Sequence, residues 1–215
     1  MLMRRDADSD THRTHGARMD AVYRTQRHIY DLTRKYYLLG RDRLIAQLDA
    51  GPGCAVLEVG CGTGRNLIAA AQRWRQARFT GLDISAAMLE TAGASLQRHR
   101  LESRIALIEA DACEFTSSPA FANRRFDRIF LSYALSMIPA WECAIEEALG
   151  ALTPEGCLHI VDFGQQERLP APFRAMLFAW LRHFHVSPRG GLRAVLEDAA
   201  RRHGRTLAFR ALYRG

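Results

Sequence analysis

The feature that most constrains the fold is a glycine-rich run that follows a short apolar stretch. Residues 55–66 read Ala-Val-Leu-Glu-Val-Gly-Cys-Gly-Thr-Gly-Arg-Asn, so that glycines alternate at Gly60, Gly62 and Gly64. A helix-forming stretch, Asn66-Leu-Ile-Ala-Ala-Ala, comes next. This order predicts a strand, a tight turn without side chains and a helix. Because glycine has no Cβ, such a turn lets a cofactor approach the backbone, and a larger residue at Gly60 is expected to fill the cofactor's space.

A carboxylate at the end of the next predicted strand favours a nucleoside cofactor. Asp83 closes the run Phe79-Thr-Gly-Leu-Asp and follows Gly64 by nineteen residues. An acid at such a strand end can accept hydrogen bonds from both hydroxyls of a ribose.

The glycine spacing indicates which nucleoside cofactor the loop binds. Dinucleotide-binding folds use G-x-G-x-x-G and seat a pyrophosphate at a helix N-terminus. Here the third glycine comes one residue earlier, and Glu58 precedes the loop. S-adenosylmethionine carries an ammonium and a sulfonium but no phosphate, so an acid beside the loop suits it better than it suits a diphosphate. A dinucleotide cofactor and a turn without any ligand are the alternatives.

With these residues the chain resembles the class I S-adenosylmethionine-dependent methyltransferases. Three further segments, 82–89, 109–112 and 126–133, fit the family's positions after strand 2, after strand 3 and along strand 4. The resemblance implies a methyltransferase that uses S-adenosyl-L-methionine. The cofactor-binding residues that it implies are Glu58, Gly60, Cys61, Gly62, Thr63, Gly64, Asn66, Asp83, Ile84, Ser85, Met88, Asp111, Ala112 and Ser132.

Strand and helix patterns alternate along the chain, which predicts a parallel sheet with right-handed crossovers. Ligands of such sheets bind at the carboxyl ends of the strands. The expected strands are 54–59, 78–83, 104–109, 126–132 and 157–163, and the expected helices are 41–48, 65–74, 86–98, 140–151, 171–184 and 189–203.

The predicted fold class is α/β: a Rossmann-like class I methyltransferase sheet, mostly parallel, with helices on both faces and an N-terminal helical extension. The class ends with two strands, the last one antiparallel. Only one strand, 206–213, is predicted at this point, so the last antiparallel strand is missing from the pattern. The expected organisation is a disordered tail (1–17), a helical acceptor or membrane segment (18–50) and a cofactor-binding domain (51–215).

Length, apolar content and cysteine usage predict a globular domain in the cytoplasm. The chain of 215 residues is 48% hydrophobic, which suits one globular domain. No apolar run approaches the roughly 18 residues that span a bilayer, and the start lacks the apolar stretch of a signal peptide. The five cysteines form no C-x-x-C pair, which predicts reduced thiols in the cytoplasm. No Cys/His spacing predicts a metal site.

The net charge of +7 is compatible with nucleic acid or with an anionic membrane surface. An RNA methyltransferase would normally show an N-P-P-Y/F motif after strand 4 or an added recognition domain. Residues 131–138 instead read Leu-Ser-Tyr-Ala-Leu-Ser-Met-Ile, so no nucleic-acid partner is expected. A non-catalytic cofactor-binding protein is disfavoured because the loop and Asp83 are intact.

Two segments outside the cofactor core point to the acceptor. Residues 23–42 and 180–189 resemble the bacterial N-methyltransferases that convert diacylglyceryl-homoserine to a trimethylated betaine lipid. Phosphatidylethanolamine is the nearest alternative acceptor, followed by a quinone or small metabolite. The enzyme that makes the homoserine lipid is the protein partner that this resemblance implies.

Spacings of three, four and seven between apolar and aromatic residues predict an amphipathic helix over 19–39. Residues 18–43 carry six arginines and one lysine against three aspartates, which suits peripheral docking to anionic lipid. Tyrosine faces suit a methylated ammonium, so Tyr23, Tyr30 and Tyr133 are the expected catalytic cage. For the homoserine carboxylate, we expect Arg34, Lys35, Tyr36 and Arg41.

Overall fold

The computed structural model describes residues 40–165, 170–183 and 186–212. The expected tail and the predicted helix 19–39 lie outside the described residues. So do five predicted site residues, which are Tyr23, Tyr30, Arg34, Lys35 and Tyr36.

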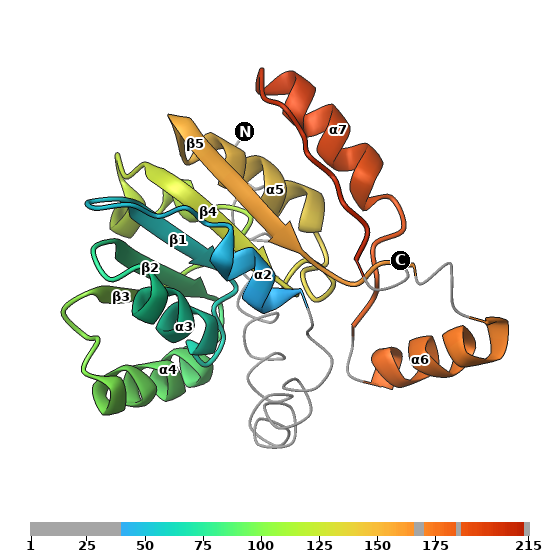
Figure 1. The fold of residues 1–215 in the computed structure, drawn as a ribbon, viewed down its shortest axis with the longest axis horizontal. Coiled ribbons are helices and arrows are strands. Elements are labelled where there is room, and N and C mark those ends of the chain that lie inside the picture. The colour runs from blue at the N-terminus through green and yellow to red at the C-terminus, as the bar shows by residue number, and fades with distance from the viewer. Residues whose placement is uncertain (1–39, 166–169, 184–185, 213–215) are drawn as a thin grey trace, which may run out of the picture.

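Five parallel strands form one sheet in the order β3-β2-β1-β4-β5 (Figure 1). Apolar, β-branched and aromatic residues fill the buried central strands, as parallel sheets covered on both faces require. The strands are β1 (Ala55–Val59), β2 (Arg78–Asp83), β3 (Ile105–Glu109), β4 (Phe126–Ser132) and β5 (Leu152–Val161).

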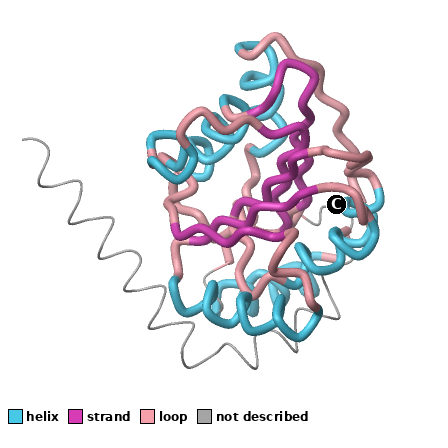
Figure 2. Tube along the Cα trace, turned by 90° about the vertical axis from the view of Figure 1, so that its left-hand side faces the viewer, coloured by secondary structure: helices cyan, strands magenta, loops and turns pink. Residues whose placement is uncertain are grey.

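Helices cover both faces of the sheet (Figures 1 and 2). One buried cluster joins α2, α3 and α4 to the sheet, and the other joins α5, α7 and two 3₁₀ turns to it. The predicted α/β fold class is therefore confirmed. The helices are α2 (Arg41–Ala46), α3 (Arg65–Arg73), α4 (Ala86–His99), α5 (Trp141–Gly150), α6 (Ala171–His183) and α7 (Leu192–Arg202), and the 3₁₀ turns are η1 (Phe115–Ser117) and η2 (Pro119–Phe121).

β5 differs from its prediction at both ends. It begins at Leu152, five residues before the predicted start, and it ends at Val161 instead of residue 163. Pro154 and Gly156 gave the early part the pattern of a turn, but Leu152 already pairs with Phe126 before a shift in register. The earlier end places Asp162 just beyond the sheet.

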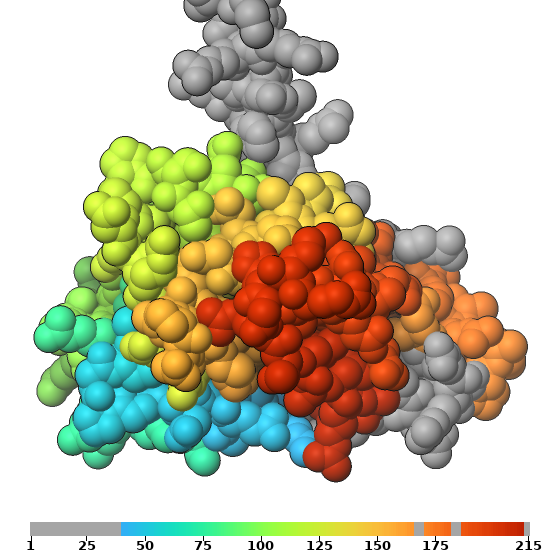
Figure 3. Space-filling model, turned by 90° about the horizontal axis from the view of Figure 1, so that it is seen from above, coloured from blue at the N-terminus to red at the C-terminus, as the bar shows by residue number. Residues whose placement is uncertain are grey.

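The prediction of a strand over 206–213 is wrong for its described part. Residues 206–212 pair with no strand, and the outer edge of β5 has no strand partner within the described ranges. The Arg205 guanidinium instead donates to the carbonyls of Thr153 at 3.0 Å and Gly156 at 2.7 Å. These bonds use a side chain where a neighbouring strand would present its backbone. The C-terminal part of the described chain, red in Figure 3, lies beside β5 without joining the sheet.

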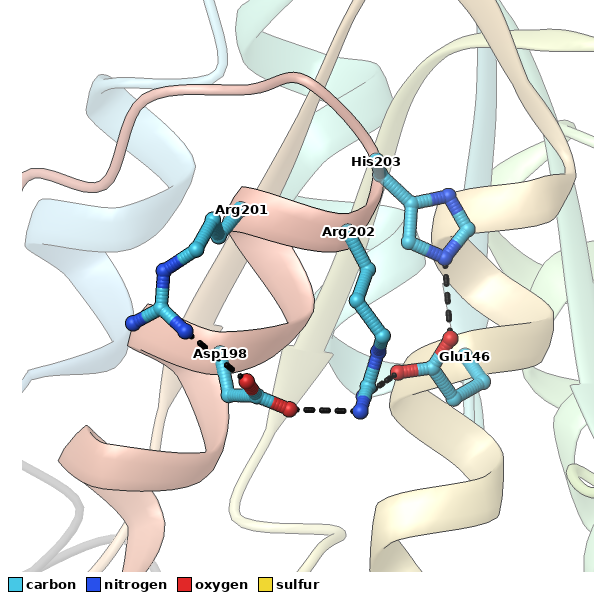
Figure 4. A network of polar contacts seen from close by, with 5 residues as sticks. All are labelled: Glu146, Asp198, Arg201, Arg202 and His203. Carbon is cyan, nitrogen blue, oxygen red and sulfur yellow. Dashed lines mark hydrogen bonds and ion pairs between the residues drawn. The ribbon is translucent and has the colours of Figure 1, made fainter.

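An exposed polar network connects α7 to α5 (Figure 4). Glu146 on α5 binds Arg202 and His203, and Asp198 binds Arg201 and Arg202. Exposed ion pairs of this kind contribute little each, about 0–1 kcal/mol. The docking of α7 therefore depends mainly on its apolar face, where Leu196 and Ala199 are buried against the core.

Candidate cofactor and acceptor site

The glycine loop turns sharply at the carboxyl end of β1. Gly60, Gly62 and Gly64 have φ values of +73°, +53° and +75°, a region that side chains rarely adopt. The amides of Gly60 and Cys61 both donate to the carbonyl of Leu82 at 2.9 Å. These bonds fasten the loop to the end of β2.

The three glycines of the loop differ in what a side chain at each position would meet. A Cβ at Gly60 would lie 2.9 Å from Cβ of Ala134, and one at Gly64 would lie 3.1 Å from Cβ of Ala92. A Cβ at Gly62 would meet nothing within 4 Å. A side chain at Gly60 would thus strike the protein itself, its predicted effect on the cofactor's space stays a prediction, and the surroundings of Gly62 are open.

Asp83 holds the loop and the following helix together. Its Oδ2 accepts the Gly62 amide at 2.7 Å, and its Oδ1 accepts the Ser85 amide at 3.0 Å. Ser85 caps α4 by accepting the Met88 amide at 3.3 Å. The half-buried Asp83 carboxylate therefore lies beside the open space at Gly62, where a ribose would need it.

Glu58 is fully buried, and its Oε1 accepts the Asn66 side-chain amide at 2.7 Å. This bond connects the end of β1 to the first turn of α3. Because the Glu58 carboxylate has no exposed surface, its predicted contact with a cofactor ammonium stays a prediction. In this arrangement the Glu58 carboxyl lies near the end of the strand that leads into the loop.

The remaining predicted cofactor residues lie at the same edge of the sheet. Asp111 follows β3, and its Oδ1 accepts the Cys113 amide at 2.7 Å. The amide of Ala110 donates to the carbonyl of Asp83 at 3.1 Å, which places the ends of β2 and β3 side by side. Ala112 and Ser132 are buried, whereas Thr63 and Ile84 are half-buried.

A second group of residues lies at the ends of β4 and β5. Tyr133 has a φ of +56°, and its ring lies 4.9 Å from the ring of Phe163. Its hydroxyl accepts the Gly40 amide at 3.1 Å, which brings the N-terminal segment to this end of the sheet. A Cβ at Gly40 would lie 2.4 Å from Val161, so only glycine allows this approach.

Asp162 completes this second group, and the sequence did not predict it. Its carboxylate accepts the amides of Ser136 at 3.0 Å and Phe163 at 2.7 Å. Burial raises its pKa above the ordinary value of 3.8, although these hydrogen bonds act in the opposite direction. An acid after the apolar run of β5 is the same signal that identified Asp83, and it would have identified Asp162 had the strand been ended at Val161.

A cavity of about 1220 Å³ extends from Tyr133, Asp162 and Phe163 to the outer edge of β5. Much of its remaining wall is apolar and comes from α6, α7 and residues 205–212. The apolar side chains in this wall include Leu177, Trp180, Leu192, Leu196, Leu207 and Phe209.

Arg41 does not line this cavity. Its guanidinium binds the neighbouring Asp42 carboxylate at 2.7 Å. Its predicted role in binding a carboxylate of the acceptor therefore requires that it exchange this partner, and the role stays a prediction.

Two of the cysteines, Cys61 and Cys113, are poorly suited to act as nucleophiles. Burial raises the pKa of Cys61 well above its ordinary value, and burial together with the neighbouring Cys143 thiol raises the pKa of Cys113 to about 12. Within the described residues, no group of three or more His, Cys, Asp or Glu side chains is arranged to hold a metal ion. None of the described helices is long and apolar enough to cross a membrane.

Comparison with known proteins agrees with this geometry. Residues 56–156, which contain the loop and the ends of β1 to β4, match the family model described as "Methyltransferase domain". Residues 56–156 therefore have the sequence of a methyltransferase domain, within a fold of the class I type. This result bears out the prediction of S-adenosyl-L-methionine as the cofactor, and the residues present fit it: an open position at Gly62, a carboxylate at Asp83 and a buried acid near the loop.

The relatives differ in what their names say they methylate. The chain is 27% identical over 179 residues to a ubiquinone/menaquinone biosynthesis C-methyltransferase of Rhizobium leguminosarum, covering 79% of this chain and 66% of that protein. It is 32% identical over 117 residues to a trans-aconitate 2-methyltransferase of Paracidovorax citrulli, covering 54% and 42%. The chain thus spans less than two thirds of the length of these relatives.

Among solved structures, the fold is similar to phosphoethanolamine N-methyltransferase 2 of Haemonchus contortus. The TM-score is 0.60 at 20% identity, covering 76% of this chain and 36% of that chain. At this identity the likeness concerns the fold alone.

Proposed function

We propose that this protein transfers methyl groups from S-adenosyl-L-methionine to the amine of a lipid, and that the lipid is diacylglyceryl-homoserine. The observation that carries the proposal is the continuity of one cavity with two kinds of wall. An aromatic and acidic end, formed by Tyr133, Phe163 and Asp162, opens into a large space whose wall is more apolar than polar. An acceptor with a cationic head and long apolar tails has both kinds of surface.

The cofactor would be held by the loop and the strand ends beside it. Bound S-adenosyl-L-methionine supplies an electrophilic methyl group. The Gly62 backbone leaves it space, Asp83 accepts the ribose hydroxyls, and Asp111 lies at the next strand end. The Glu58 charge near the loop favours a cationic ligand over a diphosphate.

The acceptor amine must lose a proton before it can attack. Asp162 suits this step because its raised pKa makes it a stronger base than an exposed aspartate. Its hydrogen bonds from Ser136 and Phe163 hold the carboxylate in one orientation. The rings of Tyr133 and Phe163 can stabilise the ammonium group, which gains one methyl group at each transfer. Alignment of the amine with the methyl group then supplies most of the rate enhancement.

A prenylated quinol is the second candidate acceptor. It is favoured by the similarity to the ubiquinone/menaquinone C-methyltransferase, which extends over 79% of this chain. A quinol would also place a long tail against the apolar wall, but it carries no cation for the Asp162 end of the cavity. A small tricarboxylate such as trans-aconitate suits neither the apolar part of the wall nor the Asp162 carboxylate, although Arg189, Arg193 and Arg205 also line the cavity.

The test is a comparison of acceptors with purified protein. Diacylglyceryl-homoserine, phosphatidylethanolamine and a demethylated quinol are each incubated with the cofactor, and the lipids are analysed by mass spectrometry. We expect the homoserine lipid to be methylated fastest. Faster methylation of phosphatidylethanolamine would show that the acceptor is this phospholipid and not the homoserine lipid. Transfer to the quinol alone would refute the proposal that the acceptor is an amine.

A further inference from the structure

One face of α6 exposes three large apolar side chains. Phe173 is 60% exposed, Met176 is 66% exposed and Trp180 is 36% exposed. Their spacing of three and four residues places them on the same side of the helix. Only two other large apolar side chains, Leu207 and Phe209, are comparably exposed in the described part of the chain.

α6 is set apart from the layers around the sheet (Figure 1). Leu181 is its buried residue, and Leu177 and Trp180 reach the wall of the cavity. The apolar face thus contributes little to the core, although contiguous exposed apolar surface is unfavourable in water. Such a face usually binds a partner.

The charge around α6 indicates the kind of partner. Residues 170–190 contain three arginines and no aspartate or glutamate, in a chain of net charge +7. A helix of thirteen residues is about 20 Å long, which suits a helix that lies in the plane of a membrane. A tryptophan beside basic residues is typical of the boundary between lipid tails and headgroups.

The position of α6 relative to the cavity connects this face to the acceptor. Trp180 belongs to both the exposed face and the cavity wall, whereas Phe173 and Met176 are exposed and do not line the cavity. A surface that receives this face would therefore lie at the edge of the cavity.

We propose that the α6 face formed by Phe173, Met176 and Trp180 docks onto the surface of an anionic lipid bilayer and brings the cavity to its lipid acceptor. The proposal rests on the proposed function for the identity of the acceptor, but the docking itself does not. The apolar side chains enter the outer part of the bilayer, and the basic composition of residues 170–190 favours anionic headgroups.

The first test measures where Trp180 lies. The full chain is mixed with vesicles of phosphatidylcholine and phosphatidylglycerol whose acyl chains carry bromine, which quenches nearby tryptophan fluorescence. The other tryptophans, Trp74 and Trp141, are packed against the two cores. We expect strong quenching in the wild-type protein and little in Trp180→Phe. Equal quenching in both proteins would overturn the proposal.

The second test measures docking and activity together. The variant Phe173→Ser/Met176→Ser should bind anionic vesicles at least about tenfold more weakly, while Phe209→Ser, a change of another exposed phenylalanine, should bind like the wild type. Turnover of vesicle-embedded acceptor should fall, and turnover of detergent-dispersed acceptor should persist.

The outcomes separate the two proposals. Vesicle binding that is unchanged in the double variant contradicts docking through α6. A wild-type protein that is a dimer in light scattering, with a monomeric double variant, also contradicts it, because the α6 face would then bind a second copy of the chain. Normal docking without methylation of any lipid amine would leave the α6 surface intact and refute the proposed function.

Discussion

The sharpest prediction concerns Asp83, and Asp127 provides its control. Asp83 binds two backbone amides at the carboxyl ends of the strands. Asp127 is also half-buried, and it binds the Ala55 amide at 2.9 Å and the Thr153 hydroxyl at 3.2 Å. Its bonds lie at the opposite, amino end of the sheet, far along β1 from the loop. Replacing each aspartate by alanine removes at least two hydrogen bonds within the protein, but only Asp83 lies beside the proposed cofactor space.

The magnitudes follow from these contacts. Each variant should lose about 1–3 kcal/mol of stability, because buried donors lose a charged acceptor. Asp83→Ala should in addition lose about 2–4 kcal/mol of cofactor binding, the contribution of a charged acceptor shared by two ribose hydroxyls. That loss corresponds to a roughly 30- to 700-fold weaker affinity. Asp127→Ala should bind the cofactor within about threefold of the wild type, because its site is distant.

Calorimetric titration with S-adenosyl-L-methionine measures the affinity, and urea unfolding measures the stability of both variants. Wild-type affinity for the cofactor in Asp83→Ala would refute the assignment of Asp83. An equal loss in both would show that affinity follows the stability of the sheet and not a contact with the ribose.

Three further predictions concern the loop, the acceptor end and the polar network. Gly62→Val should abolish cofactor binding, and its melting temperature should fall less than that of Gly60→Val, because a Cβ at Gly60 strikes Ala134 and one at Gly62 meets open space. A larger fall in melting temperature for Gly62→Val than for Gly60→Val in scanning calorimetry would contradict this account of the loop. Asp162→Asn should lower kcat at least about tenfold while cofactor affinity is retained, and wild-type activity should fall as pH is lowered through a pKa above the ordinary 3.8, since the base must be deprotonated; a pH profile shared by both proteins would exclude this base. The hydrogen bond from His203 lowers the pKa of Glu146. The small contribution of ionised Glu146 to stability is therefore present above the ordinary pKa of 4.5 and is lost as pH falls below it. Urea unfolding of Glu146→Gln should show a weaker loss of stability in that pH range than the wild type shows.

Local patterns predicted the cofactor half of the site well. The strands up to β4 start and end within about one residue of their predicted positions, because their apolar runs are bounded by glycine, proline or charged residues. Asp83 could be placed from sequence because strand ends in a parallel sheet share one edge. The roles of Gly60 and Gly62 could not be separated in this way, since they depend on Ala134, which is distant in the sequence.

The C-terminal part shows where local patterns fail. Residues 206–212 alternate as a strand would, but Arg205 binds the β5 carbonyls and leaves a cavity beside that edge. These long-range bonds have no signature in the segment itself. Asp162 was missed because the predicted strand continued to residue 163, which placed this acid inside the sheet instead of at its end.

The central claim is that this protein methylates a lipid amine, and transfer of an isotope-labelled methyl group tests it most directly. The purified full chain is incubated with S-adenosyl-L-methionine that carries a deuterated methyl group, and with anionic vesicles that contain diacylglyceryl-homoserine. Fragmentation in the mass spectrometer then locates the label. We predict successive transfer of up to three labelled methyl groups to the homoserine nitrogen. An unlabelled homoserine lipid, with label on the ring carbon of a quinol supplied in parallel, would contradict the claim.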